Sequence, residues 1–194
     1  MIGKLDRSAS REDRTAAILD AAWVLAGRDG VAGLTLRGLA RELDLSQPSL
    51  YEYFESKHAL YDALFADGNR QLLGRLENLR LPTDPRRAVK VVLRAFVEFA
   101  LADEARRQLL FHRPIPGFVP SPESYAIAEA VLARGVDVLE AAGVDDPADV
   151  DCIIAMVAGL IDSQASNDPG GTRWTRHLDR LVDLYLDNPR KDAR

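Results

Sequence analysis

The sequence predicts an all-α protein in which a small N-terminal domain of short helices precedes a larger helical bundle. Apolar residues recur at helical spacing along the 194 residues, and no alternating strand pattern extends over more than a few positions. Prolines gather between the apolar stretches, where they favour breaks between helices. A hydrophobic fraction of 47% beside 28% charged residues is typical of a folded globular chain. We expect one domain over residues 1–56 and a second over residues 57–194.

Each of the first four predicted helices is preceded by a side chain that can cap it. These helices span about 10–30, 36–43, 47–53 and 56–80, and their capping residues are Ser10, Thr35, Ser46 and Ser56. Asp13 lies three residues after Ser10, as in a capping box with a shorter acid. Gly30 is suited to end the first helix.

The later helices are longer and are separated by proline-rich or glycine-rich breaks. We expect them over about 85–102, 103–111, 121–142, 147–166 and 172–187. Residues 112–120 hold three prolines in nine positions and are predicted to form a loop. The run Asp168-Pro169-Gly170-Gly171 predicts a tight break before the last helix.

Charge and composition exclude several classes of protein. The net charge is −5, and residues 1–60 hold eight Lys/Arg against nine Asp/Glu, so no segment is basic enough to indicate nucleic-acid binding by composition. One cysteine, Cys152, and three histidines make a structural zinc site improbable, and we expect no metal and no cofactor. The N-terminal segment lacks the apolar core of a signal peptide, and no apolar run is long enough to span a membrane. We therefore expect a cytoplasmic protein with no membrane partner.

Two short helices separated by Asp44-Leu45-Ser46 are typical of a helix-turn-helix, in which the second helix enters the DNA major groove. Asp44 stands in the turn, where a left-handed residue is expected and aspartate is tolerated better than most residues. Gly38, inside the second helix, is expected to cost about 1 kcal/mol relative to alanine. The residues expected to lock the two helices together are all apolar: Leu39, Ala40, Leu43, Leu45, Leu50 and Phe54.

The residues left outside this core have a chemistry that suits DNA. The Gln47 amide can form two hydrogen bonds with adenine, and Pro48 offers an apolar face to a thymine methyl group. The hydroxyls of Ser49 and Tyr51 can donate to phosphate oxygens. Arg37 and Lys57 flank this surface as cations, and Glu52 and Glu55 must then point away from DNA. In the competing interpretation Tyr51 packs on the surface and both cations are ordinary solvated charges.

The stretch from Gly33 to Leu60 resembles the N-terminal domain of TetR-family transcriptional regulators. The residues that carry the resemblance are Gly33-Leu34-Thr35-Leu36-Arg37, Leu45-Ser46-Gln47-Pro48-Ser49-Leu50-Tyr51-Glu52-Tyr53-Phe54 and Ser56-Lys57-His58-Ala59-Leu60, and the likeness covers about residues 12–65. Asp44 departs from the pattern, since the family usually has glycine there. Residues 87–143 also faintly resemble the subgroup with a WHG-type C-terminal domain.

The resemblance implies a dimeric repressor that binds a double-stranded DNA operator and is released by an unidentified small-molecule effector. It implies Gln47, Pro48 and Tyr53 at or near bases and Thr35, Ser49, Tyr51 and Lys57 at phosphates, with Arg37 at either. An enzyme is the rival class, but no nucleophile motif, phosphate loop or HExxH pattern is present. A helix-turn-helix adaptor that acts through protein contacts is a third possibility.

The last two predicted helices carry apolar faces that suit a twofold interface, as the resemblance implies. The dimer candidates are Ile153, Ile154, Val157, Ile161, Trp174, Leu178, Leu181, Val182 and Tyr185. The alternative is that both helices pack only within one chain. The effector-pocket candidates lie in the bundle and are mostly aromatic residues, which are often core residues instead. They are Phe96, Phe99, Phe111, His112, Phe118, Tyr125, Met156 and His177.

Overall fold

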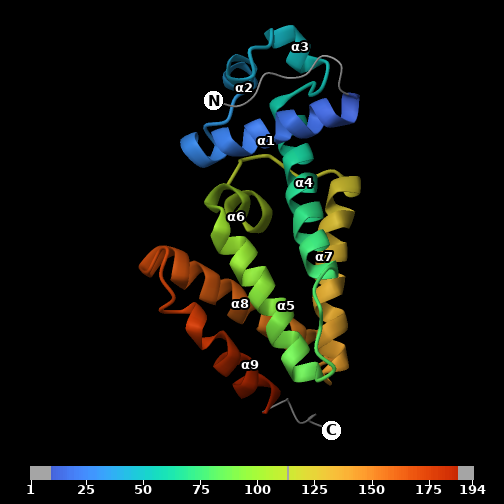
Figure 1. The fold of residues 1–194 in the computed structure, drawn as a ribbon, viewed down its shortest axis with the longest axis vertical. Helices are drawn as coiled ribbons and strands as arrows, with labels where there is room; N and C mark the ends of the chain where they lie inside the picture. The colour runs from blue at the N-terminus through green and yellow to red at the C-terminus, as the bar shows by residue number, and fades with distance from the viewer. Residues whose placement is uncertain (1–9, 113, 188–194) are drawn as a thin grey trace. The chain divides into compact units, whose positions relative to one another are not determined.

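The computed structural model describes residues 10–112 and 114–187, and within them it contains helices and connecting loops but no strand (Figure 1). The predicted all-α class is therefore confirmed. The elements in chain order are α1 (Arg11–Asp29), α2 (Leu36–Glu42), α3 (Gln47–Tyr51), α4 (Lys57–Glu77), α5 (Pro85–Ala102), α6 (Glu104–Phe111), α7 (Pro122–Ala141), α8 (Pro147–Asn167), the 3-10 turn η1 (Thr175–His177) and α9 (Leu178–Leu186).

The chain forms two compact units. The first comprises the described residues through Gln71 together with Asp103–Ala128, and the second comprises Leu72–Ala102 together with the described residues from Glu129 onwards. The division falls within α4 and within α7. Among the described helices, none has both the length and the apolar composition that crossing a membrane requires.

The predicted capping residues begin the helices that they were expected to begin. Ser10 forms a full capping box, since its Oγ accepts from the Asp13 backbone N–H at 3.1 Å while its own N–H donates to the Asp13 carboxylate at 3.3 Å. Thr35, Ser46 and Ser56 each accept a backbone N–H three residues on, at 3.0, 3.2 and 3.0 Å. These bonds satisfy N–H groups that have no partner within the helix.

The core of the first unit joins α1, α2 and α3 to the start of α4 (Figure 1). Leu39, Leu43, Leu50 and Phe54 are buried as predicted, and the buried face of α1 includes Ile18, Ala21, Ala22 and Leu25. The indole of Trp23 is buried with them and donates to the Asp67 carboxylate at 2.8 Å. The core therefore fixes α3 through one side chain, Leu50, and leaves most of that short helix to solvent.

The last helix is shorter than the predicted 172–187, because α9 begins at Leu178 after the η1 turn. The backbone N–H groups of Trp174 and Thr175 donate to the side-chain oxygen of the buried Gln164, at 2.9 and 3.3 Å. The Arg173 N–H donates to the Asp168 carboxylate at 2.8 Å, and this bond holds the pKa of Asp168 below its usual range. Side chains of the preceding segment thus accept hydrogen bonds from the backbone N–H groups of residues 173–175, where the helix was expected to start. The last helix begins only after them.

Candidate nucleic-acid interface

The turn between α2 and α3 is built on a left-handed residue, as the sequence predicts. Asp44 has φ of 54°, and the following Leu45 N–H donates to the Ala40 carbonyl at 2.9 Å. Leu45 is partly buried against the core, so the turn is held by packing as well as by hydrogen bonds. The result is a fixed connection between two short helices, the geometry on which a helix-turn-helix depends.

The exposed residues of α3 form the centre of the candidate interface. Leu50 is fully buried, whereas Gln47, Pro48 and Tyr51 are exposed, and Tyr51 keeps 46% of its surface open to solvent. Ser49 is partly buried, and its hydroxyl lies 2.7 Å from the Ser46 hydroxyl in a hydrogen bond that either can donate. The helix therefore presents an amide, an apolar ring and hydroxyl groups on one short, rigid segment.

Two cations and a hydroxyl flank this helix. Arg37 is exposed and makes no ion pair or hydrogen bond within residues 10–112 and 114–187. Thr35 is also exposed, and its oxygen accepts the Gly38 N–H while its own proton stays available. Lys57 is partly buried: its Nζ donates to the Ala32 carbonyl at 3.0 Å and lies over the Tyr61 ring at 5.3 Å. Two ammonium protons of Lys57 are left for another acceptor.

An unpredicted contact joins the start of α1 to the end of α3. The Arg11 guanidinium donates to the Glu52 carbonyl at 2.8 Å and lies over the Tyr53 ring, 5.6 Å from its centroid. Tyr53 is partly buried against the core, so it is the least accessible of the predicted base-contacting residues. Arg11 and Glu52 are 41 positions apart, which explains why no local pattern indicated this contact.

Acidic residues of the same segment are partly neutralised by arginine. Arg28 donates to the neighbouring Asp29 at 2.9 Å and lies 3.6 Å from the Glu42 carboxylate. The hydrogen bond from Arg28 holds the pKa of Asp29 below its usual range. Arg28 thus offsets the local field of these two acids, while the net charge of the segment stays the same.

The α1–α2 connection is anchored to the beginning of α4. The buried Tyr61 hydroxyl donates to the Val31 carbonyl at 2.9 Å, beside the bond from Lys57 to Ala32. Gly33 lies in the same connection, where a Cβ would stand 2.3 Å from the Asp29 carbonyl oxygen. Glycine is required at Gly33 because only a residue without a Cβ permits this close backbone approach.

The eight effector-pocket candidates are divided between the two units. In the first unit Phe118 packs on Tyr61 at 5.7 Å and on His58 at 6.1 Å, while Phe111, His112 and Tyr125 are exposed. In the second unit Phe99 is buried and Phe96 partly buried in α5. Only Met156 and His177 of the eight line a common groove, which has a volume of about 450 Å³ and lies between α8 and the η1–α9 segment.

The nine dimer candidates divide by burial. Five are buried by packing within the single chain: Ile153, Val157, Ile161, Leu178 and Val182. Trp174, Leu181 and Tyr185 are partly buried, and Ile154 keeps 43% of its surface exposed. Leu184 of α9, which is not among the candidates, is 52% exposed. The exposed apolar surface of these two helices therefore includes Ile154, which is one of the nine candidates, and Leu184, which is not.

Two helices joined by a fixed turn, with the second helix buried through one residue and otherwise exposed, define a helix-turn-helix protein of the DNA-binding class. Residues 18–64 match the family model described as "Bacterial regulatory proteins, tetR family". The matched region contains the whole helix-turn-helix, so this part of the chain is similar to the DNA-binding domain of that family.

The relatives agree with this assignment. The chain is 30% identical over 116 residues to the HTH-type transcriptional regulator Mb1846 of Mycobacterium bovis, which covers 58% of this chain and 50% of that protein. It is 40% identical over 65 residues to the class D tetracycline repressor protein of Escherichia coli, covering 34% and 28% of the two chains. The chain thus aligns with about half the length, or less, of these curated relatives.

The fold likeness extends further than the sequence likeness. A protein of unknown function from Rhodococcus sp. RHA1 superposes with a TM-score of 0.76 at 25% identity, over 95% of this chain and 98% of the other. The helices beyond the matched region therefore follow an arrangement that solved structures already contain.

Proposed function

We propose that this chain is a sequence-specific transcriptional regulator, a cytoplasmic dimeric repressor that a small-molecule effector releases from a DNA operator. DNA binding is assigned to residues 1–56, and effector binding and dimerisation are assigned to residues 57–194. The observation that carries the proposal is the exposure of Gln47, Pro48 and Tyr51 on a helix that the buried Leu50 holds in place. The names of the relatives, a transcriptional regulator and a tetracycline repressor, support it.

The proposed contacts with DNA follow from side-chain chemistry. Gln47 reads a base edge through its amide, and Pro48 packs against a thymine methyl group. Arg37 and Lys57 neutralise phosphates, and Tyr51 donates its hydroxyl to a phosphate oxygen.

Three further DNA contacts are proposed for side chains that also make contacts within the chain. The Thr35 and Ser49 hydroxyls contact phosphates in this proposal. Within the chain, Thr35 caps α2, and the Ser49 hydroxyl is hydrogen-bonded to Ser46, which caps α3. Tyr53 lies near the DNA edge, and its ring is partly covered by Arg11.

Dimerisation is proposed through the exposed apolar residues of α8 and α9. Ile154 and Leu184 expose about half of their surfaces, and Ala155 and Gly159 are exposed small residues four positions apart that permit close helix approach. A twofold interface would bury these residues against their own copies. The Leu184→Glu variant should shift the chain towards a monomer in light scattering, whereas a wild-type chain that is already monomeric at the same concentration would refute the dimer.

The DNA-binding part is tested by selecting duplexes from a random library at physiological salt and measuring affinity for the enriched pool. We expect the triple variant Gln47→Ala, Ser49→Ala, Tyr51→Ala to retain its helical circular dichroism and to lose preference for that pool. An adaptor that works through protein contacts would enrich no pool. A variant that binds the pool as well as the wild type would remove α3 from the interface.

A further inference from the structure

The C-terminal end of α3 is held by a side chain from another helix. Of the five residues of α3, which are too few for a stable isolated helix, only Leu50 is buried. The last carbonyl groups of a helix lack partners within it. The Leu50 carbonyl accepts from the Tyr53 and Phe54 N–H groups at 3.0 and 3.1 Å. The Glu52 carbonyl accepts from the Arg11 guanidinium at 2.8 Å, so Arg11 completes this C-terminal cap.

Arg11 makes a second contact with the same end of the segment. Its guanidinium lies over the Tyr53 ring, 5.6 Å from the centroid, and Tyr53 also packs against the core. A guanidinium is planar and carries several N–H groups, so it can donate to a carbonyl and lie over an aromatic ring at the same time. The two contacts together restrict the backbone at Glu52 and the ring of Tyr53.

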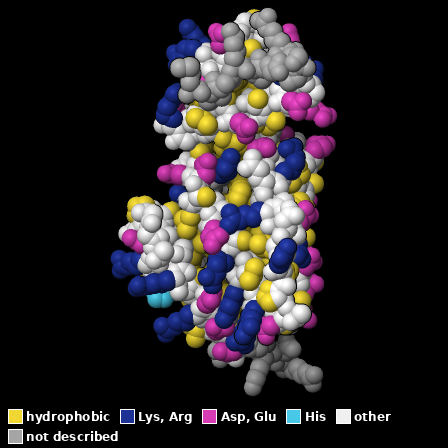
Figure 2. All heavy atoms as spheres, viewed as in Figure 1, with side chains coloured by type: hydrophobic (Ala, Val, Ile, Leu, Met, Phe, Trp, Pro, Cys, Tyr) yellow, Lys and Arg dark blue, Asp and Glu magenta, His cyan; other side chains and the backbone are white. Residues whose placement is uncertain are grey.

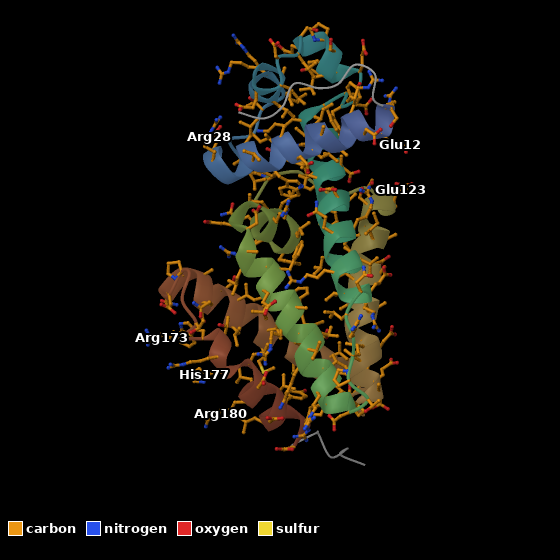
Figure 3. The ribbon with its side chains drawn as sticks, in the orientation of Figure 1. Glu12, Arg28, Glu123, Arg173, His177 and Arg180 are labelled. Atoms are coloured by element: carbon orange, nitrogen blue, oxygen red, sulfur yellow. The ribbon has the colours of Figure 1, made fainter. Side chains whose placement is uncertain are left out.

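The start of α1 gives Arg11 a fixed base. Ser10 caps the helix, and the Thr15 hydroxyl donates to the Arg11 carbonyl at 2.9 Å. Further along α1, Ile18 is buried in the core of the first unit. Figure 3 labels Glu12, the residue that follows Arg11, at the N-terminal end of α1. The Arg11 side chain thus connects α3 to a helix that the core holds.

The charge of residues 1–60 does not by itself favour DNA. These residues hold eight Lys/Arg and nine Asp/Glu. Blue and magenta side chains both lie near the top of the view in Figure 2, where Figure 1 places α1 and α2. A surface of mixed sign gains less from the phosphate backbone than a basic one. Binding then depends on how α3 and Tyr53 are oriented towards the duplex.

We propose that Arg11 is a positioning residue for DNA recognition, which holds the C-terminal end of α3 and the Tyr53 ring in the orientation that reads the operator. This role rests on the proposed function, since Arg11 acts through the helix that contacts DNA. Arg11 is exposed, so direct contact with a phosphate is the rival role. A phosphate contact depends on charge, whereas positioning depends on the geometry of the guanidinium.

The experiment measures the affinity of the full chain for the enriched duplex pool and for duplexes of random sequence, over a salt series. Arg11→Gln should weaken binding to the pool about tenfold and change binding to random duplexes less than about twofold, with an unchanged salt slope. Arg11→Lys keeps the charge but not the planar guanidinium, so it should still weaken binding to the pool about threefold or more.

Arg14→Gln is the matched control. It removes the same charge from the first turn of α1, where the Arg14 Nε donates to the Ser10 carbonyl at 3.3 Å and not to α3. The ratio of pool affinity to random-duplex affinity should therefore change less than about twofold.

Amide hydrogen exchange of the free chain tests the positioning without DNA. The Tyr53 and Phe54 N–H groups donate to the Leu50 carbonyl at the end that Arg11 holds. Arg11→Gln should speed the exchange of these two groups about tenfold, because a bond to a charged donor is lost beside them. Arg14→Gln should leave their exchange rates unchanged.

The role of Arg11 is overturned if Arg11→Gln binds the pool as well as the wild type, if it weakens both duplexes alike with a lower salt slope, or if Arg11→Lys restores wild-type preference. Faster exchange with unchanged preference would also overturn it, because the contact would then serve stability alone. A wild-type chain that enriches no pool would refute the proposed function and this role with it. Should Arg11→Gln fail to fold by circular dichroism, the comparison of Arg11→Lys with the wild type decides.

Discussion

At the scale of single residues, the helix-turn-helix depends on positions where the local backbone restricts which residues fit. Asp44 adopts the left-handed conformation that the turn requires. Gly38 also has a local reason, because a Cβ there would lie 2.9 Å from the Thr35 Oγ1 that caps the helix. The expected advantage of alanine at Gly38 is therefore opposed by a contact with the cap.

Gly33 provides a sharp test of close backbone approach. Gly33→Ala should destabilise the chain by about 1–3 kcal/mol, because its Cβ would meet the Asp29 carbonyl at 2.3 Å and the backbone would have to shift. Gly27→Ala is the matched control: Gly27 lies in α1 with nothing within 4 Å of an added Cβ, so this change should stabilise by roughly 0.5–1 kcal/mol. Urea denaturation measures the free energy of unfolding of both variants. Equal changes in the two would contradict the requirement for close backbone approach at Gly33.

Gln47 and Lys57 are predicted to affect DNA binding differently. Gln47→Ala should cost about 1–3 kcal/mol at one operator position and relax preference there. Lys57→Ala should weaken all sequences alike and reduce the salt slope by roughly one, if Lys57 meets a phosphate. Binding titrations over a salt series on operator variants measure both. Unchanged base preference in Gln47→Ala would remove its base-reading role.

Local patterns in the sequence predicted the capping residues, the left-handed turn residue and the buried faces, since each depends on neighbours within one or two turns. The contacts between distant segments were not predicted: Arg11 with Glu52, Trp23 with Asp67, and Lys57 with Ala32 join positions 25 to 44 residues apart. Which of many surface charges meet is decided by the packing of helices.

At the scale of helices, α5 and α9 are joined by a ladder of opposite charges. Basic residues spaced four apart on α5 face acids spaced four apart on α9: Arg86 pairs with Asp187 and Asp183, Lys90 with Asp183, and Arg94 with Asp179. Opposite charges at this spacing fix the register of two neighbouring helices. The ladder therefore sets which residues of α9 stay exposed for a partner or a ligand.

Asp183 makes the ladder sensitive to pH. The hydrogen bond from Lys90 holds the pKa of Asp183 below its usual range, so its stabilising contribution is present above the ordinary carboxyl pKa of about 4 and is lost as the pH falls through the lowered value. Asp183→Asn should lower the Tm at pH 7 and low salt, with a smaller difference in 1 M NaCl and none once the carboxyl is protonated. An equal difference at every pH and salt concentration would show that packing, not charge, is lost.

A second junction between helices holds the start of α7 to α4. The Asp62 carboxylate accepts from the Ser121 N–H at 2.7 Å and from the Ser121 and Ser124 hydroxyls at 2.8 Å each. Asp62→Ala leaves these donors without that acceptor and should cost about 1–3 kcal/mol in urea denaturation. Ser124→Ala removes a single bond and should cost less; a larger loss for Ser124→Ala would place the stabilisation in packing instead.

At the scale of the whole molecule, one unit holds the helix-turn-helix and the other holds α8 and α9 with their exposed apolar residues. The match to the family model covers residues 18–64, whereas DNA binding by the whole protein, dimerisation, effector binding and repression are proposals. If the chain is a twofold dimer, its operator must have matching symmetry, because each copy reads an equivalent half-site.

The most direct test of the central claim is to determine the motif in duplexes that the full chain selects from a random library at physiological salt. We predict a near-palindrome whose half-sites lie about one helical turn apart, roughly 10 base pairs, or a multiple of that spacing. A motif without twofold symmetry would contradict the dimer. Failure of a folded, dimeric chain to enrich any sequence would contradict sequence-specific DNA binding itself.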